Sequence, residues 1–455
     1  MKLSIMWGWL GSFRQSLNTQ LWPIPTLGVV LALGLGVGLP RMDAAIDQDL
    51  SPTVTAFLFG GGPGAARTVL QAIAGSLVTV TSLTFSLTVV TLQLASSQFS
   101  PRLLRTFTSD RFVHVTLALF LSTFTYSLTV LRTVRTVDES QDAFVPQVSV
   151  TAAYLLGLAS VVGLVLFLAH LVTQIRVETM LRNVHRDATQ TARRLTTAHG
   201  SPHGSETADL LTPPAGAWPV LARTSGFLLR VDEDALLAAA VDLDVDVLID
   251  REPGSSLVAG TPVGAVWSRS ACKLDQSARD DVLKRIASTI VSGFEPTSFQ
   301  DIGFGLRQLT DVATKALSPG VNDPTTAVHA LGHSAALLCE LACRDLGPRL
   351  LRDDHHRVRV VLRRPTLADL LETAVTQPRR YGASDPVVLQ RLAALLREVA
   401  WCTTEPDHRL AIELQLDRLR ATIAGADFDS VEVERLAAHT GRVDDAFAGR
   451  WFGSP

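Results

Sequence analysis

Four apolar segments stand out in the first part of the chain, and most charged residues follow them. A helix needs about 20 residues to cross the hydrocarbon core of a bilayer, and the last three segments are long enough. The first is shorter, but Trp22 precedes it as an interfacial anchor would. The pattern predicts a transmembrane domain over 1–175, with helices at about 24–39, 68–95, 113–131 and 148–172.

The composition supports a membrane half followed by a soluble half. Hydrophobic residues make up 47% of the 455 residues, and the mean hydropathy is +0.25. The formal net charge of -3 gives no argument for a nucleic-acid partner. We therefore expect the lipid bilayer to be a partner and nucleic acid not to be one.

A cleaved signal peptide is the alternative for the first segment, because Lys2 and Arg14 could form its basic region. However, Pro40, Arg41 and Asp43 follow the apolar run, and no clear small-residue cleavage site does. We expect a retained helix.

Arginines predict the orientation of the spans. The loop between the second and third carries Arg102, Arg105 and Arg111, and more arginines follow the fourth. The other loops mix arginines with several acids. By the positive-inside rule, both termini then lie in the cytosol.

The second apolar segment carries two stripes of polar residues. At 100° per residue, one contains Ser76, Thr79, Ser82, Ser86 and Gln93, and the other contains Thr81, Thr84, Thr88 and Thr91. Hydroxyl groups can serve helix packing or bond to the i−4 carbonyl. They can also line a hydrated pathway, because they replace part of the hydration of an ion. Four helices enclose little space, so a pathway requires a homo-oligomer.

Arg102 and Arg105 follow this segment, after Ser100 and Pro101, which predict a new helix start. The two arginines could hold lipid phosphates or form the cytosolic mouth of a pathway. The predicted spans contain no Asp, Glu or Lys, which argues against a proton-coupled transporter.

The soluble half predicts an α+β region in three parts. A helix and linker occupy 176–222, a small β-rich module 223–270, and a helical domain 275–455. The spacing in "PGSSLVAGTPV" resembles small β-barrel modules of the lipoyl type, but no Lys stands at the expected hairpin tip. We assign no cofactor.

Within the helical domain, "ARDDVLKRIASTIVSGF" and "SFQDIGFGLRQLTDVATKAL" both show helical spacing of apolar residues. Ser298 and Asp301 suggest a capped start for the second helix. Arg307, Asp311 and Lys315 predict a ladder of charges along it.

The stretch "TKALSPGVNDPTTAVHALGH" ends that helix and starts another. Either Asn322 or Asp323 caps the new helix, and Pro324 suits its first position. The alternative is an anion-binding or docking turn, formed by Asn322, Asp323, Thr325 and Thr326.

The new helix carries His329, His333, Cys339 and Cys343 on one face. The two pairs are centred about 15 Å apart along the helix, too far for one tetrahedral metal site. We expect a buried or interface face and no metal. All four cysteines lie in the C-terminal half, where a reducing cytosol argues against disulfides. No catalytic motif is present, and we expect no enzyme.

Three motifs carry a resemblance: "SLTVVTLQLASSQFSPRLLRTF", "FVPQVSV" and "GLRQLTDVATKALSPGVNDPTTAV". They resemble the bacterial predicted membrane protein family catalogued as domain of unknown function 2254, over roughly residues 20 to 450. The resemblance implies a bacterial inner-membrane protein with a cytosolic C-terminal region, and it assigns no catalytic residue.

Together these features predict an oligomeric, channel-like protein for ions or small solutes. The 68–95 helix would form the pathway, and the cytosolic region would assemble or gate it. The alternative is a membrane sensor or scaffold that transports nothing and whose cytosolic half binds a ligand or partner.

Overall fold

A computed structural model describes residues 22–46, 58–98, 110–135, 144–174, 176–198, 212–269, 275–403 and 405–452. The chain divides into two compact units, Met1–Arg176 and Val177–Pro455. The boundary lies one residue beyond the predicted end of the transmembrane domain at residue 175.

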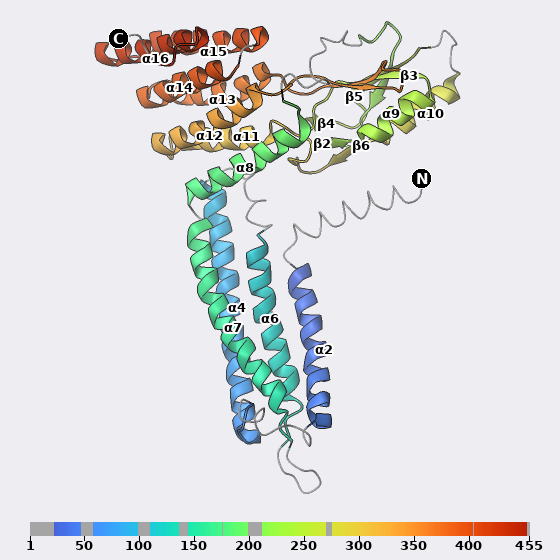
Figure 1. Ribbon diagram of the computed structural model, residues 1–455, viewed down its shortest axis with the longest axis vertical. Helices are drawn as coiled ribbons and strands as arrows, with labels where there is room; N and C mark the ends of the chain where they lie inside the picture. The colour runs from blue at the N-terminus through green and yellow to red at the C-terminus, as the bar shows by residue number, and fades with distance from the viewer. Residues whose placement is uncertain are drawn as a thin grey trace. The chain divides into compact units, whose positions relative to one another are not determined.

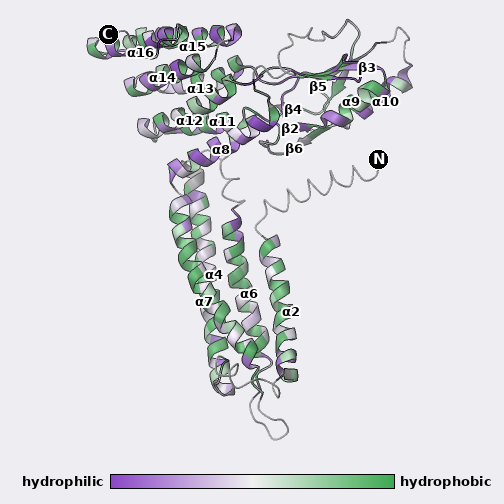
Figure 2. Cartoon of the chain, in the orientation of Figure 1, coloured by the Kyte–Doolittle hydropathy of each residue, from purple (hydrophilic) through white to green (hydrophobic). Residues whose placement is uncertain are grey.

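The N-terminal unit contains four long helices, α2 (Pro23–Ile46), α4 (Pro63–Gln98), α6 (Arg111–Leu131) and α7 (Gln147–Gln174) (Figure 1). Each is long and apolar enough to cross a membrane, and hydrophobic residues dominate their surfaces in Figure 2. The four predicted apolar helices are therefore confirmed as helices. The first is longer than predicted, because it continues through Pro40 to Ile46 instead of ending at residue 39.

Small residues allow α2 to lie close against α6. Gly28, Ala32 and Gly36 repeat every four residues, so they share one face of α2. A Cβ atom at Gly28 would lie 2.5 Å from the Ser122 hydroxyl oxygen, and one at Gly36 would lie 2.8 Å from Thr129 Cβ. This is the small-residue packing by which membrane helices associate.

The C-terminal unit begins with α8 (Val177–Leu195) and continues into a mixed α/β part. Its larger sheet has the order β1-β5-β3-β8-β7, in which only β3 and β8 run parallel. A second sheet has the order β4-β2-β6. The larger sheet consists of β1 (Trp218–Leu221), β3 (Val245–Ile249), β5 (Pro262–Ser268), β7 (Arg349–Arg352) and β8 (Val358–Leu362). The smaller one consists of β2 (Gly226–Val231), β4 (Ser256–Leu257) and β6 (Ile290–Gly293).

Helices α9 (Glu233–Asp242) and α10 (Gln276–Ala287) accompany the sheets, and one apolar core joins these elements. The core includes Leu228 from β2, Leu236 from α9, Val266 from β5 and Val360 from β8, each with no exposed surface. Strands and helices far apart in the sequence therefore share one interior.

Two predictions about this region are corrected. The β-rich module does not end at residue 270, because β6, β7 and β8 come from the range 275–455 that was predicted to be helical. It is therefore not a self-contained barrel of the lipoyl type. The run from Thr289 to Val291 is β-branched, which favours a strand over the predicted continuation of the helix.

The remaining helices form three stacked pairs, α11 with α12, α13 with α14, and α15 with α16 (Figure 1). Helices α12, α14 and α16 make one layer, and α11, α13 and α15 make the other. Helix α8 packs on α11 and α12. The bounds are α11 (Phe304–Ala316), α12 (Pro324–Ala342), α13 (Leu367–Tyr381), α14 (Pro386–Cys402), α15 (Pro406–Ala424) and α16 (Ser430–Phe447).

Candidate functional site

The two polar stripes of α4 have different surroundings within the N-terminal unit. Four threonines form the inward stripe, and each donates its hydroxyl hydrogen to the carbonyl four residues earlier, at 2.7 to 2.8 Å. They are buried or half-buried against the bundle. The inward stripe consists of Thr81, Thr84, Thr88 and Thr91. It serves helix packing, because its hydroxyl groups are satisfied by the helix itself.

The outward stripe consists of Ser76, Thr79, Ser82, Ser86 and Gln93, and all five residues are exposed on the surface of the unit. Within the described part of the chain, only the Ser76 side chain among them makes a hydrogen bond, to the Ile73 carbonyl at 3.0 Å. Exposed apolar residues flank the stripe, among them Val78, Phe85 and Val90. The bundle therefore leaves a narrow polar line on an otherwise apolar helix surface.

The predicted arginines at the end of this helix, Arg102 and Arg105, lie outside the described residues. The same holds for Cys272 and for the predicted helix start at Ser100 and Pro101. Their assignments remain predictions.

The N-terminal unit also contains a buried carboxylate that sequence reasoning placed in a loop. Asp43 lies on the extension of α2 and is 8% exposed. Its Oδ2 accepts hydrogen bonds from the Ser149 backbone N–H at 2.9 Å and from the Ser149 hydroxyl at 2.7 Å. The Tyr126 hydroxyl donates to the Ser149 carbonyl at 3.1 Å. The backbone N–H groups in the first turn of a helix lack partners within that helix. Asp43 supplies a partner to the first turn of α7 and thereby links it to α2.

In the C-terminal unit, the turn before α12 has the predicted local structure. Asp323 is the N-cap, its Oδ1 accepts from the Thr326 N–H at 3.0 Å, and Pro324 is the first helical residue. Hydrogen bonds from Thr326 hold the pKa of Asp323 below its usual value. Asn322 takes the left-handed conformation, with φ of 49°. A carboxylate already occupies the N–H groups that an anion would use, so the geometry favours a cap.

A groove of about 880 Å³ lies on the C-terminal unit, between α8, α12 and α14. Helix α12 forms its floor, where Gly332 and Ala336 present little side chain. Trp401 and Trp451 stand at one end with ring centres 5.4 Å apart, in an edge-to-face arrangement. Apolar residues such as Leu181 and Val328 share the lining with ionisable residues from all three helices.

Histidines from two helices meet in this groove. The rings of His185 on α8 and His333 on α12 are 5.5 Å apart, and His185 Nδ1 lies 3.3 Å from the His333 carbonyl oxygen. His329 Nδ1 lies 3.7 Å from Glu178 Oε1 on α8. Burial, together with His185, Arg182 and His329, lowers the pKa of His333. The predicted interface face of α12 is therefore the floor of a groove, and α8 forms the wall beside it.

Sequence reasoning did not connect Glu178 and His185 with this face. The buried residues Met180, Leu181, Val184 and Ala188 of α8 follow helical spacing, so the sequence indicates an amphipathic helix. No local pattern shows which helix it would contact.

Two cysteines at the far end of the groove, Cys339 and Cys343, have raised pKa values. Burial and the neighbouring Cys402 raise the pKa of Cys339, so it stays protonated. Cys343 donates to the Cys402 carbonyl at 3.3 Å. Across the described ranges, no three His, Cys, Asp or Glu side chains gather closely enough to hold a metal ion.

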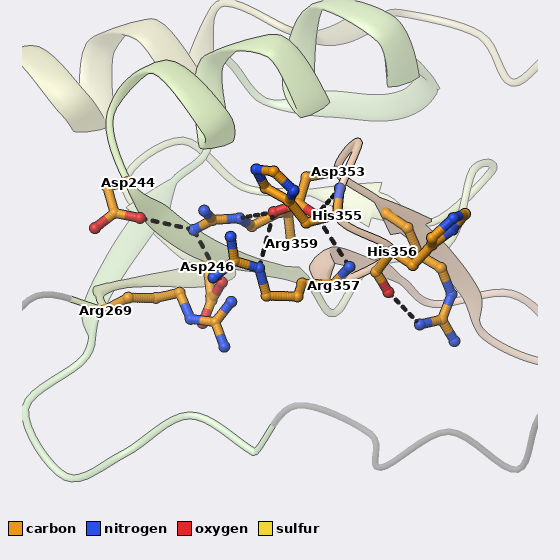
Figure 3. Close-up of polar contacts among 9 residues, drawn as sticks. Asp244, Asp246, Arg269, Asp353, His355, His356, Arg357 and Arg359 are labelled. Atoms are coloured by element: carbon orange, nitrogen blue, oxygen red, sulfur yellow. Dashed lines mark hydrogen bonds and ion pairs between the residues drawn. The ribbon is translucent and has the colours of Figure 1, made fainter.

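A second polar cluster is formed by residues on and next to strands β3 and β8 of the larger sheet and is shown in Figure 3. Arg359 on β8 donates to Asp353 at 3.0 Å and to Asp244 at 2.9 Å, and its Nη1 lies 3.9 Å from Asp246. The side chains of Arg359, Asp246 and Asp353 are at most 7% exposed. Arg269, the residue after β5, approaches Asp246 to 3.4 Å at the margin of the cluster. The cluster ties together β3, β8 and the turn between β7 and β8.

The pKa values in this cluster move in opposite directions. Burial raises the pKa of Asp246, although Arg269 and Arg359 oppose the rise. Burial also acts on Asp353, but the Arg357 backbone N–H and the Arg359 guanidinium outweigh it and lower its pKa to about 2. Opposite charges balance here, so the cluster serves the fold.

Arg307 on α11 forms an ion pair with Asp301, a buried carboxylate that precedes the helix. Asp301 does not cap the helix as predicted, because α11 starts at Phe304 with Gly303 as its N-cap. Arg307 turns toward Asp301, so the predicted ladder does not begin at Arg307. Burial raises the pKa of Asp301 to about 6, although Arg307 opposes the rise.

Comparison with known proteins gives the family of the chain. The family described as "Predicted membrane protein (DUF2254)" matches residues 18–398. The chain is 37% identical over 407 residues to "Uncharacterized protein Rv1290c" of Mycobacterium tuberculosis, covering 88% of this chain and 75% of that protein. "Uncharacterized protein Mb1321c" of Mycobacterium bovis matches with the same identity and coverage. No solved structure matches. The motifs, the four apolar helices and these relatives agree, and the chain belongs to the DUF2254 family of predicted membrane proteins.

Proposed function

We propose that the protein is an oligomeric, channel-like protein of the bacterial inner membrane, with both termini in the cytosol. Several copies would bring their α4 helices together, so that the outward stripes line a pathway for ions or small solutes. The C-terminal units would assemble the oligomer or gate it, without enzymatic activity. The outward stripe of α4 is the observation that carries this proposal.

The two stripes of α4 differ in their hydrogen bonding. The hydroxyl groups of the inward threonines are satisfied within their own helix, whereas the side chains of Thr79, Ser82, Ser86 and Gln93 have no hydrogen-bond partner among the described residues. On a helical wheel these four residues lie within about 60° of one another. In a bilayer this face would meet lipid unless water or another copy covered it. Polar groups without partners are unfavourable in hydrocarbon.

The flanking residues support contact between copies. Val78 and Phe85 lie on one side of the outward stripe and Leu83 and Val90 on the other, and all four are exposed. Such apolar flanks can pack against neighbouring helices while the narrow stripe between them faces water. No Asp, Glu, Lys or Arg lies on α4 between Thr68 and Gln98, so the pathway would depend on hydroxyl and amide groups.

Cysteine scanning tests whether the stripe meets water. In a full-length background without native cysteines, cysteines replacing outward-stripe residues should react with a membrane-impermeant thiol reagent. Cysteines replacing Thr84 and Thr88 of the inward stripe are the matched controls and should stay protected. Equal protection of both stripes would exclude a pathway along α4.

Measurements of conductance test for transport directly. The purified protein in a planar bilayer should give discrete currents, and the Ser82→Leu/Ser86→Leu variant should change their size. Val161→Leu/Val165→Leu, at exposed apolar positions of α7, is the control and should leave them unaltered. Silent bilayers containing folded oligomer would reject the channel.

The groove on the C-terminal unit favours a second candidate, a membrane sensor or scaffold. Its volume of about 880 Å³ is within the range of sites that bind small molecules. Under this alternative, α4 only packs against other helices, and the groove receives a ligand or partner. Uniform protection in the scan, together with silent bilayers, would favour it.

A further inference from the structure

We propose that the contact between the N-terminal half of α8 and α12 is sensitive to pH, and that acidification separates α8 residues 178–185 from α12. The inference concerns the C-terminal unit alone. It does not depend on whether the protein forms a channel.

The contact places two imidazole rings against each other. His185 and His333 have ring centres 5.5 Å apart, and His185 Nδ1 lies 3.3 Å from the His333 carbonyl oxygen. Both rings are half-buried. At neutral pH, uncharged rings pack here without repulsion. Protonation of both would bring two like charges together at a partly desolvated interface, which is unfavourable.

The charges around the rings do not compensate for these protons. On α8, Arg182 adds a third positive charge near His333. On α14, Arg391 donates to both carboxylate oxygens of Glu398 at 2.7 and 2.8 Å, so this carboxylate already has a positive partner. The other ionisable residues in the groove lining are Glu178, His329, Cys339 and Cys402. Helices α11 and α13 also pack on α12, but among the described residues they contribute nothing to this lining.

One pair would oppose the opening. A protonated His329 is attracted to Glu178, whose carboxylate lies 3.7 Å away. However, these side chains are 49% and 64% exposed, so water screens the attraction. The repulsion between the half-buried rings of His185 and His333 therefore dominates.

The direction in which pH changes the stability of the contact follows from the lowered pKa of His333. A histidine whose folded pKa lies below its unfolded value of 6.5 stabilises its contact above pH 6.5. That stabilisation is lost as the pH falls below 6.5 toward the lowered value. The closing equilibrium should weaken by up to tenfold per pH unit in this window as His333 titrates.

The rest of α8 limits how far the opening extends. A Cβ on Gly305 of α11 would lie only 2.3 Å from Ala188 Cβ, so the two helices are in close contact there. Farther along, Arg193 pairs with Glu340 at 3.0 Å. These contacts contain no histidine, so they should hold at acid pH. The release is therefore confined to the segment before Ala188, which begins shortly after α7 ends at Gln174.

Hydrogen exchange of the full-length protein in detergent tests the proposal. Amides 178–185 should lose up to tenfold protection per pH unit below about pH 6.5, after correction for intrinsic rates. Amides 192–195 should show no such loss. The His333→Gln and His185→Gln variants should each weaken the pH dependence. His355→Gln/His356→Gln, in the exposed turn between β7 and β8, is the control and should keep it.

If the histidine variants misfold, a variant with the opposite expected effect still tests the proposal. Glu178→Gln removes the carboxylate that lies 3.7 Å from His329, so its acid-induced loss of protection should be larger than that of the natural protein. The proposal is overturned if protection of 178–185 is independent of pH between 8 and 5.5. It is also overturned if the pH dependence survives in a folded His185→Gln/His333→Gln variant.

Discussion

Replacing Arg359 with Met should strongly destabilise the α/β part of the C-terminal unit. Arg359 is the one positive charge that contacts Asp244, Asp246 and Asp353 together in the described structure. Its removal leaves two carboxylates that are at most 5% exposed, Asp246 and Asp353, without their shared partner. Met fills much of the space but supplies no charge, so the change tests the ion pairs more than packing.

The magnitude follows from what remains around the carboxylates. Breaking a buried ion pair by removing one partner costs about 3–5 kcal/mol. Asp353 keeps hydrogen bonds from the His355 and Arg357 backbone N–H groups, and Asp246 keeps Arg269 at 3.4 Å. We therefore expect the lower end, roughly 3 kcal/mol, which is about a hundredfold loss of protection because 1.4 kcal/mol corresponds to a factor of ten.

Hydrogen exchange of β3 and β8 in the full-length protein measures this loss. Arg285→Met is the matched control, because Arg285 pairs with Asp242 at 2.5 Å while both side chains are about half exposed. An exposed pair contributes about 0–1 kcal/mol. Equal protection in the two variants would refute the reasoning.

The pH dependence gives an independent check on the same variant. Without Arg359, the pKa values of Asp246 and Asp353 rise above those in the natural protein. A carboxyl with a raised pKa costs stability when it is ionised, and protonation at lower pH relieves that cost. The deficit of Arg359→Met should therefore be largest at neutral pH and shrink toward pH 4.

Three further substitutions have expected outcomes. Gly36→Leu should lower the thermal stability of the N-terminal unit in detergent by about 1–3 kcal/mol, because its Cβ meets Thr129 at 2.8 Å, whereas Gly34→Leu faces open space and should not. Asp43→Ala should cost about 1–3 kcal/mol in the same assay, because it leaves the buried Ser149 groups without an acceptor; Asp43→Asn keeps an acceptor oxygen and should cost less. Gly254→Ala should destabilise the smaller sheet in hydrogen exchange of β2, because φ is +90° and the new Cβ would lie 2.0 Å from Asp301 Oδ2.

Local features of the fold could be predicted from the sequence. The four apolar helices were identified from the length of their hydrophobic runs, and the start of α12 from Pro324 and a cap at Asn322 or Asp323, which the structure assigns to Asp323. The boundaries were less accurate, since α2 continues through Pro40 to the buried Asp43. Proline did not end the helix there, because packing against neighbouring helices can keep a proline-containing membrane helix intact.

Pairings between distant segments could not be predicted. Strand β8 lies in a charged stretch that was predicted to be helical, although "RLLRDDHHRVRVVL" contains two short apolar runs around a polar turn. Its partner in the parallel pair is β3, and the Asp244–Arg359 bond crosses 115 residues. No short-range periodicity carries such information, because the pairing depends on the shared core.

The candidate site likewise combines features that the sequence determined with features that depend on the tertiary structure. The sequence by itself determined that α4 is an apolar helix with two polar stripes, since residue spacing fixes the faces of a helix. Only the tertiary structure decided that the threonine stripe faces the bundle and that the stripe from Ser76 to Gln93 faces outward. Likewise, the sequence placed His329 and His333 on one face of α12, but the fold brought Glu178 and His185 of α8 against them. A helix defines its own faces, whereas what covers each face depends on the packing of the whole unit.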